Sequence, residues 1–448
     1  MSGEAMNRRA FLQSSAAGLA AGAAVSLIGT GAMGANDKIV VGFMGLGGRG
    51  TQLLGYVAPR KDAEIAYVAD PDARRLAAPA RATEKLTGKK PKEVADFRTI
   101  LDDKAVDVLF NATPDHWHVL PVILACQAGK DAYVEKPLSH NVWEGRQAVK
   151  AARKHNRVVQ VGLQNRSAPY CTAAIEYLRS GKLGDVHLVR VLNMKTRGRI
   201  GPKPDAEPPK GVDYDLWLGP APKRPFNPNH FHGGWYWFWD FSGGDIVCDG
   251  VHQMDIARWL IGRGLPRSVV STGGKHFFDD AQDCPDTQHV HYDYGDLTMT
   301  FELTLWTPYM KKTPWAMRDT DEFPNWTFNG TRVELYGTKG LMILGRHGGG
   351  WQAWDADWKL IGEKPGRQAY LEHIENLFQC IRSRKRPNAD VEEGHLSAAL
   401  CHIANISQRC GGRKLAFDPD KEQFPGDAEA GQLLKRPGRP PYTIPEEV

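Results

Sequence analysis

The sequence is poor in cysteine, with seven among 448 residues, scattered along the chain and without a C-x-x-C spacing. This pattern predicts neither a disulfide framework nor a zinc ribbon. Neither sign of charge dominates, because the sequence has 57 Lys and Arg against 52 Asp and Glu, and it contains no basic run. The small excess of positive charge argues against a nucleic-acid partner. No internal repeat is present, so a solenoid is excluded. What remains is an ordinary globular composition, 42% hydrophobic and 24% charged, that can bury a large core.

The first 35 residues lack the run of about 20 apolar residues that a bilayer-spanning helix requires. They contain Asn7-Arg8-Arg9-Ala10-Phe11-Leu12, then a weakly apolar stretch over 14–29 rich in Ala and Gly, then small residues up to Ala35. This order resembles a twin-arginine export signal. We therefore expect residues 1–35 to be removed and the protein to be periplasmic, without stable membrane insertion.

A glycine-rich turn follows the first buried apolar run, at 39–44. It reads Gly45-Leu46-Gly47-Gly48-Arg49-Gly50, which fits G-x-G-x-x-G between a strand and a helix. Its glycines permit a tight turn, close approach of a pyrophosphate, and helix–strand packing. A second strand over 64–69 ends at Asp70, where a carboxylate can accept hydrogen bonds from an adenosine ribose. The acid favours NAD, while Arg74 and Arg75 leave NADP open.

Strands and helices alternate up to about residue 164, with further strands predicted over 106–112, 132–135 and 158–162. This rhythm predicts an α/β fold, a doubly wound parallel sheet forming a dinucleotide-binding Rossmann domain over 36–164. Later segments at 186–193, 287–304, 331–336 and 340–345 alternate like antiparallel strands, and 370–383 and 393–410 are typical of helices. We therefore expect an α+β domain with an open, largely antiparallel sheet over 165–417. The Pro-rich tail over 418–448 is expected to wrap the surface.

Several motifs along the mature chain together resemble one family. They are Thr113-Pro114 with His118, Glu135-Lys136-Pro137, Trp217-Leu218-Gly219-Pro220-Ala221-Pro222, and Gly243-Gly244-Asp245-Ile246 leading to Gly250-Val251-His252-Gln253-Met254-Asp255. The sequence is similar to the glucose–fructose oxidoreductase, inositol dehydrogenase and rhizopine-catabolism family, Gfo/Idh/MocA. The resemblance implies a cofactor between the two domains and a polyol, sugar or glycoside over its nicotinamide. It also implies a homo-oligomer, a dimer or a tetramer.

The resemblance further implies that Lys136 and His252 are the catalytic pair. Oxidation of a secondary alcohol needs a base for the hydroxyl proton and a donor that steadies the developing charge, and either residue could be the base. Many relatives carry an acid four residues before this histidine, where this chain has Cys248. Because a thiol cannot orient an imidazole as a carboxylate does, Asp249 is expected to take that role if the turn is shifted.

The predicted contacts extend from the glycine turn to the aromatic run at 235–239 and beyond. The residues expected to bind the cofactor are Gly45, Gly47, Gly48, Arg49, Gly50, Asp70, Asn111, Thr113, Pro114, His118, Glu135, Lys136 and Asn165. Those expected to contact the substrate are Lys136, Arg166, His232, Trp235, Asp245 and His252. Some of the aromatics can stack on a sugar ring and others can be core. No metal is expected, since His230 and His232 have no third ligand at a convincing spacing.

Three functions are compatible with these features. The first is an NAD(P)-dependent oxidoreductase that acts on a CH–OH group of a sugar, polyol or glycoside. The second is redox-neutral, NAD-dependent glycoside hydrolysis, by oxidation, elimination, addition of water and reduction; export favours such a self-regenerating cofactor, and equally a sugar–sugar transhydrogenation. Lys136 counts against hydrolysis, because that exported branch often lacks this lysine, whereas the segment 231–235 resembles it. The third is a redox sensor or scaffold with a vestigial pocket, against which Lys136 and His252 argue.

Overall fold

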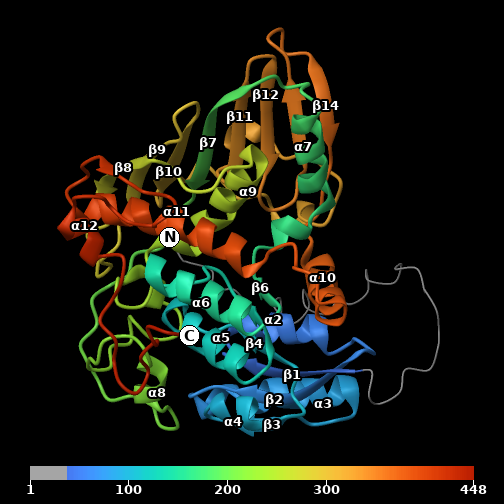
Figure 1. Cartoon of the computed structure of the whole chain (residues 1–448), viewed down its shortest axis with the longest axis vertical. Coiled ribbons are helices and arrows are strands. Elements are labelled where there is room, and N and C mark those ends of the chain that lie inside the picture. Colours follow the sequence, from blue (N-terminus) through green and yellow to red (C-terminus); the bar gives the residue numbers. More distant parts are fainter. Residues whose placement is uncertain (1–37) are drawn as a thin grey trace, which may run out of the picture. The chain divides into compact units, whose positions relative to one another are not determined.

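The computed structural model describes residues 38–448, and the predicted export signal lies outside them. The first of two sheets has six parallel strands in the order β3-β2-β1-β4-β5-β6 (Figure 1). These strands are β1 (Ile39–Met44), β2 (Ala63–Ala69), β3 (Lys92–Val94), β4 (Val108–Asn111), β5 (Asp131–Val134) and β6 (Val159–Val161). A crossover between β1 and β4 makes this a doubly wound Rossmann sheet, as predicted.

Helices cover both faces of this sheet because its central strands are apolar on both sides. The helices are α2 (Gly48–Val57), α3 (Ala77–Thr87), α4 (Arg98–Asp102), α5 (Val119–Gln127) and α6 (Val142–Lys154). Helices α5 and α6 share one buried cluster with the sheet, and α2 shares another. The second cluster also takes in apolar side chains of α10 (Tyr370–Ser383), which comes from the C-terminal half of the chain.

The second sheet has nine strands in the order β14-β13-β12-β11-β7-β10-β9-β8-β15, antiparallel except between β7 and β10. The strands are β7 (Val186–Met194), β8 (Ser268–Gly274), β9 (Thr287–Asp293), β10 (Thr298–Thr304), β11 (Arg332–Gly337), β12 (Gly340–Gly345), β13 (Trp351–Trp354), β14 (Leu360–Lys364) and β15 (Leu415–Ala416). This is the predicted largely antiparallel sheet. The other helices of the described part of the chain are α7 (Pro169–Arg179), α8 (Tyr214–Leu218), α9 (Val251–Ile261), α11 (Val391–Arg409) and α12 (Ala428–Gln432).

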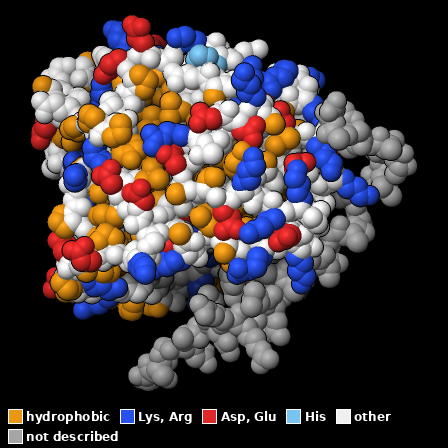
Figure 2. Space-filling view, turned by 90° about the horizontal axis from the view of Figure 1, so that it is seen from below, with side chains coloured by type: hydrophobic (Ala, Val, Ile, Leu, Met, Phe, Trp, Pro, Cys, Tyr) orange, Lys and Arg blue, Asp and Glu red, His pale blue; other side chains and the backbone are white. Residues whose placement is uncertain are grey.

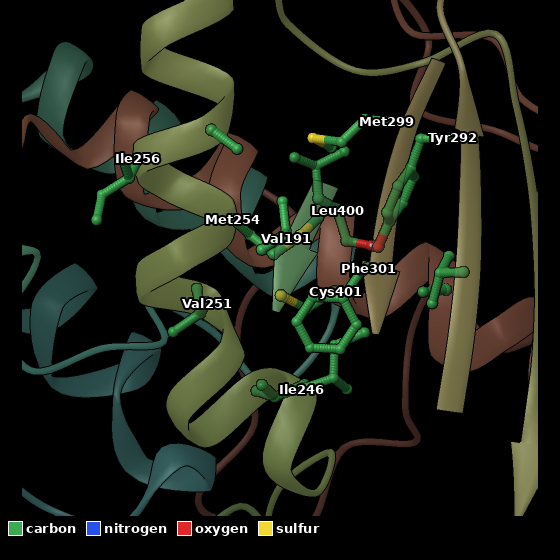
Figure 3. Close-up of a cluster of buried hydrophobic side chains, with 14 of the residues drawn as sticks. Val191, Ile246, Val251, Met254, Ile256, Tyr292, Met299, Phe301, Leu400 and Cys401 are labelled. Carbon is green, nitrogen blue, oxygen red and sulfur yellow. The ribbon is translucent and has the colours of Figure 1, made fainter. Parts of the chain in front are cut away.

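Helices α9 and α11 form the layer that packs against the second sheet. In Figure 3, Met254 of α9 lies beside Val191 of β7, and Leu400 of α11 lies close by. A π-helical turn over Ile246–Gly250 leads into α9. The sequence pattern did not predict this turn, and it determines where Cys248, Asp249 and His252 stand.

The tail over residues 418–448 contacts both domains: Phe424 and Ala430 join the core of the second domain, and the last residues pack on the Rossmann domain. Tyr442, Ile444 and Val448 join its core, and the Tyr442 ring meets Trp117 edge-on at 5.4 Å between centroids. On the face shown in Figure 2, basic and acidic side chains are interspersed. Between residues 38 and 448 no helix is both long and apolar enough to cross a membrane. All seven cysteines are free, and six of them are buried.

Candidate active site

The glycine turn after β1 is tight enough to require glycine at two positions. Gly45 has a φ of +80°, and a Cβ atom there would lie 2.7 Å from the backbone of Ala112 and Thr113. A Cβ atom on Gly50 would lie 1.9 Å from the Gly45 carbonyl oxygen. The turn and the start of α2 are therefore in direct contact, which brings the helix N-terminus against the end of the strand.

The N-terminus of α2 offers unpaired backbone donors. Its N-cap is Gly47, no side chain caps it, and its first turn contains no acid. Gly48 has open space where a Cβ atom would stand. Free amide groups with the positive end of the helix dipole suit a pyrophosphate.

Asp70 follows the neighbouring strand β2 and lies beside this turn. Its carboxylate accepts hydrogen bonds from the backbone amides of Leu46 at 2.8 Å and Asp72 at 2.9 Å. Burial raises the pKa of this carboxyl, although the two amide hydrogen bonds oppose the shift. Each oxygen keeps a free lone pair, so Asp70 can still accept hydrogen bonds from ribose hydroxyls.

One cavity, open to solvent, joins these groups. The predicted residues that line it are Gly45, Gly47, Gly48, Arg49, Asp70, Thr113, Pro114, His232 and Trp235. Arg75 also lines it and lies over Gly47. The glycine cradle and the free amides fit a dinucleotide. Of these nine residues, His232 and Trp235 were expected at the substrate; the structure places them at the nucleotide cavity, where His232 binds the Asp72 carboxylate at 2.7 Å.

Asn111 and His118 support the cavity rather than line it. The Asn111 side-chain amide donates to the carbonyl of Trp117 at 3.1 Å, and its oxygen accepts from the Thr113 hydroxyl at 2.6 Å. The His118 ring bridges the carbonyls of Thr113, at 2.9 Å, and Pro137, at 2.5 Å. These bonds couple the loop after β4 to the loop after β5.

Glu135 connects the end of β5 to the glycine turn. Its carboxylate accepts a hydrogen bond from Arg49 Nε at 2.7 Å and another from the Tyr133 hydroxyl at 3.0 Å. Burial acts to raise the pKa of this carboxyl, but Arg49 and Lys136 outweigh burial and lower it. Glu135 is therefore ionised; it positions Arg49 and also accepts a 3.3 Å hydrogen bond from the backbone amide of Lys136.

Lys136 reaches across to the second domain. Its ammonium donates a 2.6 Å hydrogen bond to the carbonyl of Cys248, in the π-helical turn, one turn before His252. His252 is buried, and its pKa is well below the usual range because of burial and the positive charges of Arg346 and Lys136. The structure thus brings together the two residues predicted to be catalytic. A neutral imidazole there can accept a proton.

Asp249 does not take the orienting role that the sequence suggested. Its carboxylate binds Lys195 Nζ at 2.6 Å, Lys312 Nζ at 2.5 Å and Arg346 Nη2 at 3.4 Å. These cations outweigh the effect of burial and lower the pKa of Asp249 well below its usual value. Three cations satisfy the carboxylate, so it turns toward them and not toward His252.

A different carboxylate lies next to Cys248. Asp115, in the loop after β4, accepts hydrogen bonds from the Ser242 hydroxyl and, at 3.9 Å, from the Cys248 thiol. It is almost fully buried, and burial raises its pKa although His118 and Lys136 act in the opposite direction. Sequence reasoning missed Asp115; its position at the carboxyl end of a central strand was the available signal.

Three other predicted contacts bind other groups of the protein and do not line the nucleotide cavity. Arg166 is buried, with Nε 2.9 Å from Asp255 and Nη2 3.0 Å from Glu393, so it does not reach the site. Asn165 donates to the Arg346 carbonyl at 2.9 Å and to the Tyr170 hydroxyl at 2.8 Å. Asp245 binds Lys195 at 2.8 Å. Lys195, Lys312 and Arg346 were not predicted, because they follow or lie between strands far apart in the chain.

The two histidines that the sequence offered as metal ligands, His230 and His232, have other partners. His230 packs edge-on against Phe238 at 4.2 Å between ring centroids, while His232 is bound to Asp72. Over the described part of the chain, no group of three or more His, Cys, Asp or Glu side chains is arranged to hold a metal ion.

A Rossmann domain with a dinucleotide cavity, joined to an open-sheet domain that contributes a histidine beside a strand-end lysine, defines an NAD-dependent oxidoreductase. Residues 39–163 match the family described as oxidoreductase family, NAD-binding Rossmann fold, and residues 197–300 and 359–444 match its C-terminal alpha/beta domain. The chain belongs to the Gfo/Idh/MocA family of oxidoreductases.

Relatives agree with this assignment. The chain is 24% identical over 305 residues to the uncharacterized oxidoreductase YrbE of Bacillus subtilis, covering 68% of this chain and 72% of that protein. It is 24% identical over 295 residues to scyllo-inositol 2-dehydrogenase (NAD(+)) of the same organism, covering 64% and 71%. The crystal structure of aldose-aldose oxidoreductase from Caulobacter crescentus, 18% identical, shares the fold with a TM-score of 0.61 over 85% of this chain and all of that one.

Proposed function

We propose that the protein oxidises a secondary alcohol of a sugar, polyol or glycoside, or reduces the corresponding carbonyl group, with Lys136 and His252 as its catalytic residues. The observation that carries the proposal is the 2.6 Å hydrogen bond from the Lys136 ammonium to the Cys248 carbonyl, which holds a lysine of the nucleotide domain beside His252. The names of relatives such as scyllo-inositol 2-dehydrogenase support a carbohydrate-like substrate.

Bound NAD supplies two-electron oxidation of the alcohol carbon. The residues of the chain accept the hydroxyl proton and stabilise the developing charge. Neutral, buried His252 accepts the hydroxyl proton, and the Lys136 ammonium stabilises the oxygen as negative charge develops on it. Glu135 keeps Arg49 at the glycine turn through a 2.7 Å hydrogen bond, and the Cys248 carbonyl holds the Lys136 ammonium at the site.

The test uses the protein lacking residues 1–35, NAD and a panel of sugars, polyols and aryl glycosides, with NADH absorbance as the readout. Lys136→Ala is expected to lower kcat by roughly 10²- to 10⁴-fold while NADH affinity stays nearly unchanged. The matched control is Lys150→Ala, an exposed lysine on α6, which is expected to behave as wild type. Wild-type turnover by Lys136→Ala would remove Lys136 from the mechanism.

The same panel distinguishes the other functions. Catalytic release of an aglycone without net NADH would replace the dehydrogenase with redox-neutral glycoside hydrolysis. Binding of NADH without turnover of any substrate would favour a vestigial pocket and a sensing or scaffold role.

Export through the twin-arginine route to the periplasm is also part of the proposal, and Arg8 and Arg9 support it. Replacement of both by lysine is expected to retain the full-length precursor in the cytoplasm, which cell fractionation would show. We further propose a homo-oligomer, a dimer or a tetramer. A monomer in sedimentation equilibrium would contradict this expectation.

A further inference from the structure

Basic side chains from three separate segments meet around Asp249. Lys195 follows β7, Lys312 lies in the long loop after β10, and Arg346 follows β12, yet all three bind the same carboxylate at 2.6, 2.5 and 3.4 Å. Asp249 is the residue after Cys248, whose carbonyl binds Lys136. The basic cluster, defined as Lys195, Lys312 and Arg346, is therefore part of the same site as the catalytic pair.

The acids at this position do not balance the bases. The basic cluster brings three positive charges, whereas Asp245 and Asp249, the acids that it binds, bring two negative ones, leaving an excess of one. The side chains of Lys195, Lys312 and Arg346 are only 17%, 31% and 13% exposed, so water screens the excess poorly. A cluster with a purely structural role would be expected to pair each base with an acid.

Two features show that Asp245 and Asp249 do not fully compensate the charge of the cluster. Burial, together with the positive charges of Lys195 and Arg346, lowers the pKa of Lys312 to about 8 even though Asp249 is adjacent. The Nε–H of Arg346 is buried and has no hydrogen-bond acceptor. An added anion would supply that acceptor and offset the repulsion around Lys312.

We propose that the substrate is an acidic carbohydrate, whose carboxylate binds Lys312 and Arg346 while a hydroxyl-bearing carbon of the same sugar faces Lys136 and His252. This inference rests on the proposed function and narrows its substrate class to sugar acids such as uronates and aldonates. A guanidinium beside an ammonium suits a carboxylate, because the planar fork matches its two oxygens. The pyrophosphate of the cofactor already has its donors at α2, so it does not account for these bases.

The test is a set of binding titrations on the wild-type protein saturated with NADH. Because this cofactor is already reduced, it cannot oxidise an alcohol, and only binding is measured. The probes are D-glucuronate, D-galacturonate and D-gluconate, each compared with its neutral amide and with D-glucose 6-phosphate. We expect at least one acid to bind roughly 10- to 100-fold more tightly than its amide. If no acid binds more tightly than its amide, the inference is wrong. If only the phosphate gains affinity, the anionic group is a phosphate and the carboxylate assignment is wrong.

Variants assign the effect to the cluster. Lys312→Met is expected to remove the preference for the acid without weakening the amide, and Arg346→Gln is expected to reduce it. Lys311→Met, an exposed neighbour, removes the same charge from the same loop and is expected to keep the preference. If Lys311→Met and Lys312→Met lose the preference for the acid equally, the effect is one of general surface charge. The proposed binding position of the carboxylate would then be wrong.

The outcome is separable from that of the proposed function. Acid binding without NADH formation from NAD would support the acidic ligand and refute the dehydrogenase. NADH formation from neutral sugars, with no gain for their acids, would support the dehydrogenase and refute the acidic substrate.

Discussion

Two glycines of the same helix, Gly50 and Gly55 in α2, make opposite predictions for the same substitution. A Cβ atom on Gly50 would lie 1.9 Å from the Gly45 carbonyl oxygen, whereas one on Gly55 would meet nothing within 4 Å. Gly50→Ala therefore forces the helix start away from the turn, and Gly55→Ala adds a better helix former in open space.

The size of each effect follows from these distances. Non-bonded Cβ contacts below 3.0 Å essentially never occur, so Gly50→Ala requires a shift of about 1.1 Å, the difference between 3.0 and 1.9 Å. We expect this overpacking to lower the free energy of unfolding by about 1–3 kcal/mol. A displacement of this size at the phosphate-binding amides is expected to weaken NADH roughly 10- to 100-fold. Gly55→Ala is expected to raise stability by about 0.5–1 kcal/mol and to leave NADH binding unchanged.

The assay is urea denaturation of both variants together with a fluorescence titration of NADH. Because the helix, the substitution and the added methyl group are the same, a general effect of alanine on α2 would change both variants alike. Wild-type NADH affinity in Gly50→Ala would show that the α2 N-terminus does not bind the pyrophosphate, and the glycine-cradle argument would fail.

Two further predictions concern stability. Arg166→Leu leaves the buried Asp255 carboxylate without its main partner and is expected to lower the free energy of unfolding, measured by urea denaturation, by about 3–5 kcal/mol. Adding Asp255→Leu is expected to recover most of this loss. If the effects of the two substitutions simply add, the pairing is contradicted. Burial lowers the pKa of His402 from 6.5 to about 4, so below pH 6.5 the unfolded chain takes up a proton that the folded chain does not. The stability that is lost between pH 6.5 and pH 4 is therefore expected to be smaller in His402→Gln, by up to roughly 3 kcal/mol. An unchanged dependence of stability on pH in this variant would refute the prediction.

Features encoded in short stretches of sequence were predictable. The strand, glycine turn and helix at 39–57 and the acid after β2 depend on neighbouring residues, so hydrophobic pattern and motif spacing predict them. The helix α10 and the strand β12 also coincide with the predicted 370–383 and 340–345. The meeting of Lys136 with His252 was predicted only through the resemblance, because it joins two domains.

The partners of Asp249 could not be predicted in this way. Lys195 and Lys312 are 54 and 63 residues from it along the chain, and no local pattern brings such positions together. The π-helical turn at Ile246–Gly250 was missed because one additional residue per turn leaves little trace in a short hydrophobic pattern. Arg166 was misassigned because its sequence neighbours do not reveal that Asp255 and Glu393 enclose it.

The packing of α10 against the Rossmann sheet affects how the chain can fold during synthesis. Ile374, Leu377 and Phe378 complete the apolar cluster that contains Leu53 and Leu54. A ribosome that has released only the first 164 residues has made every strand of that sheet but has not yet made this part of its cover. The nucleotide-binding unit therefore reaches its final packing only after most of the polypeptide has emerged. A fragment that ends at residue 164 would expose an apolar surface to water.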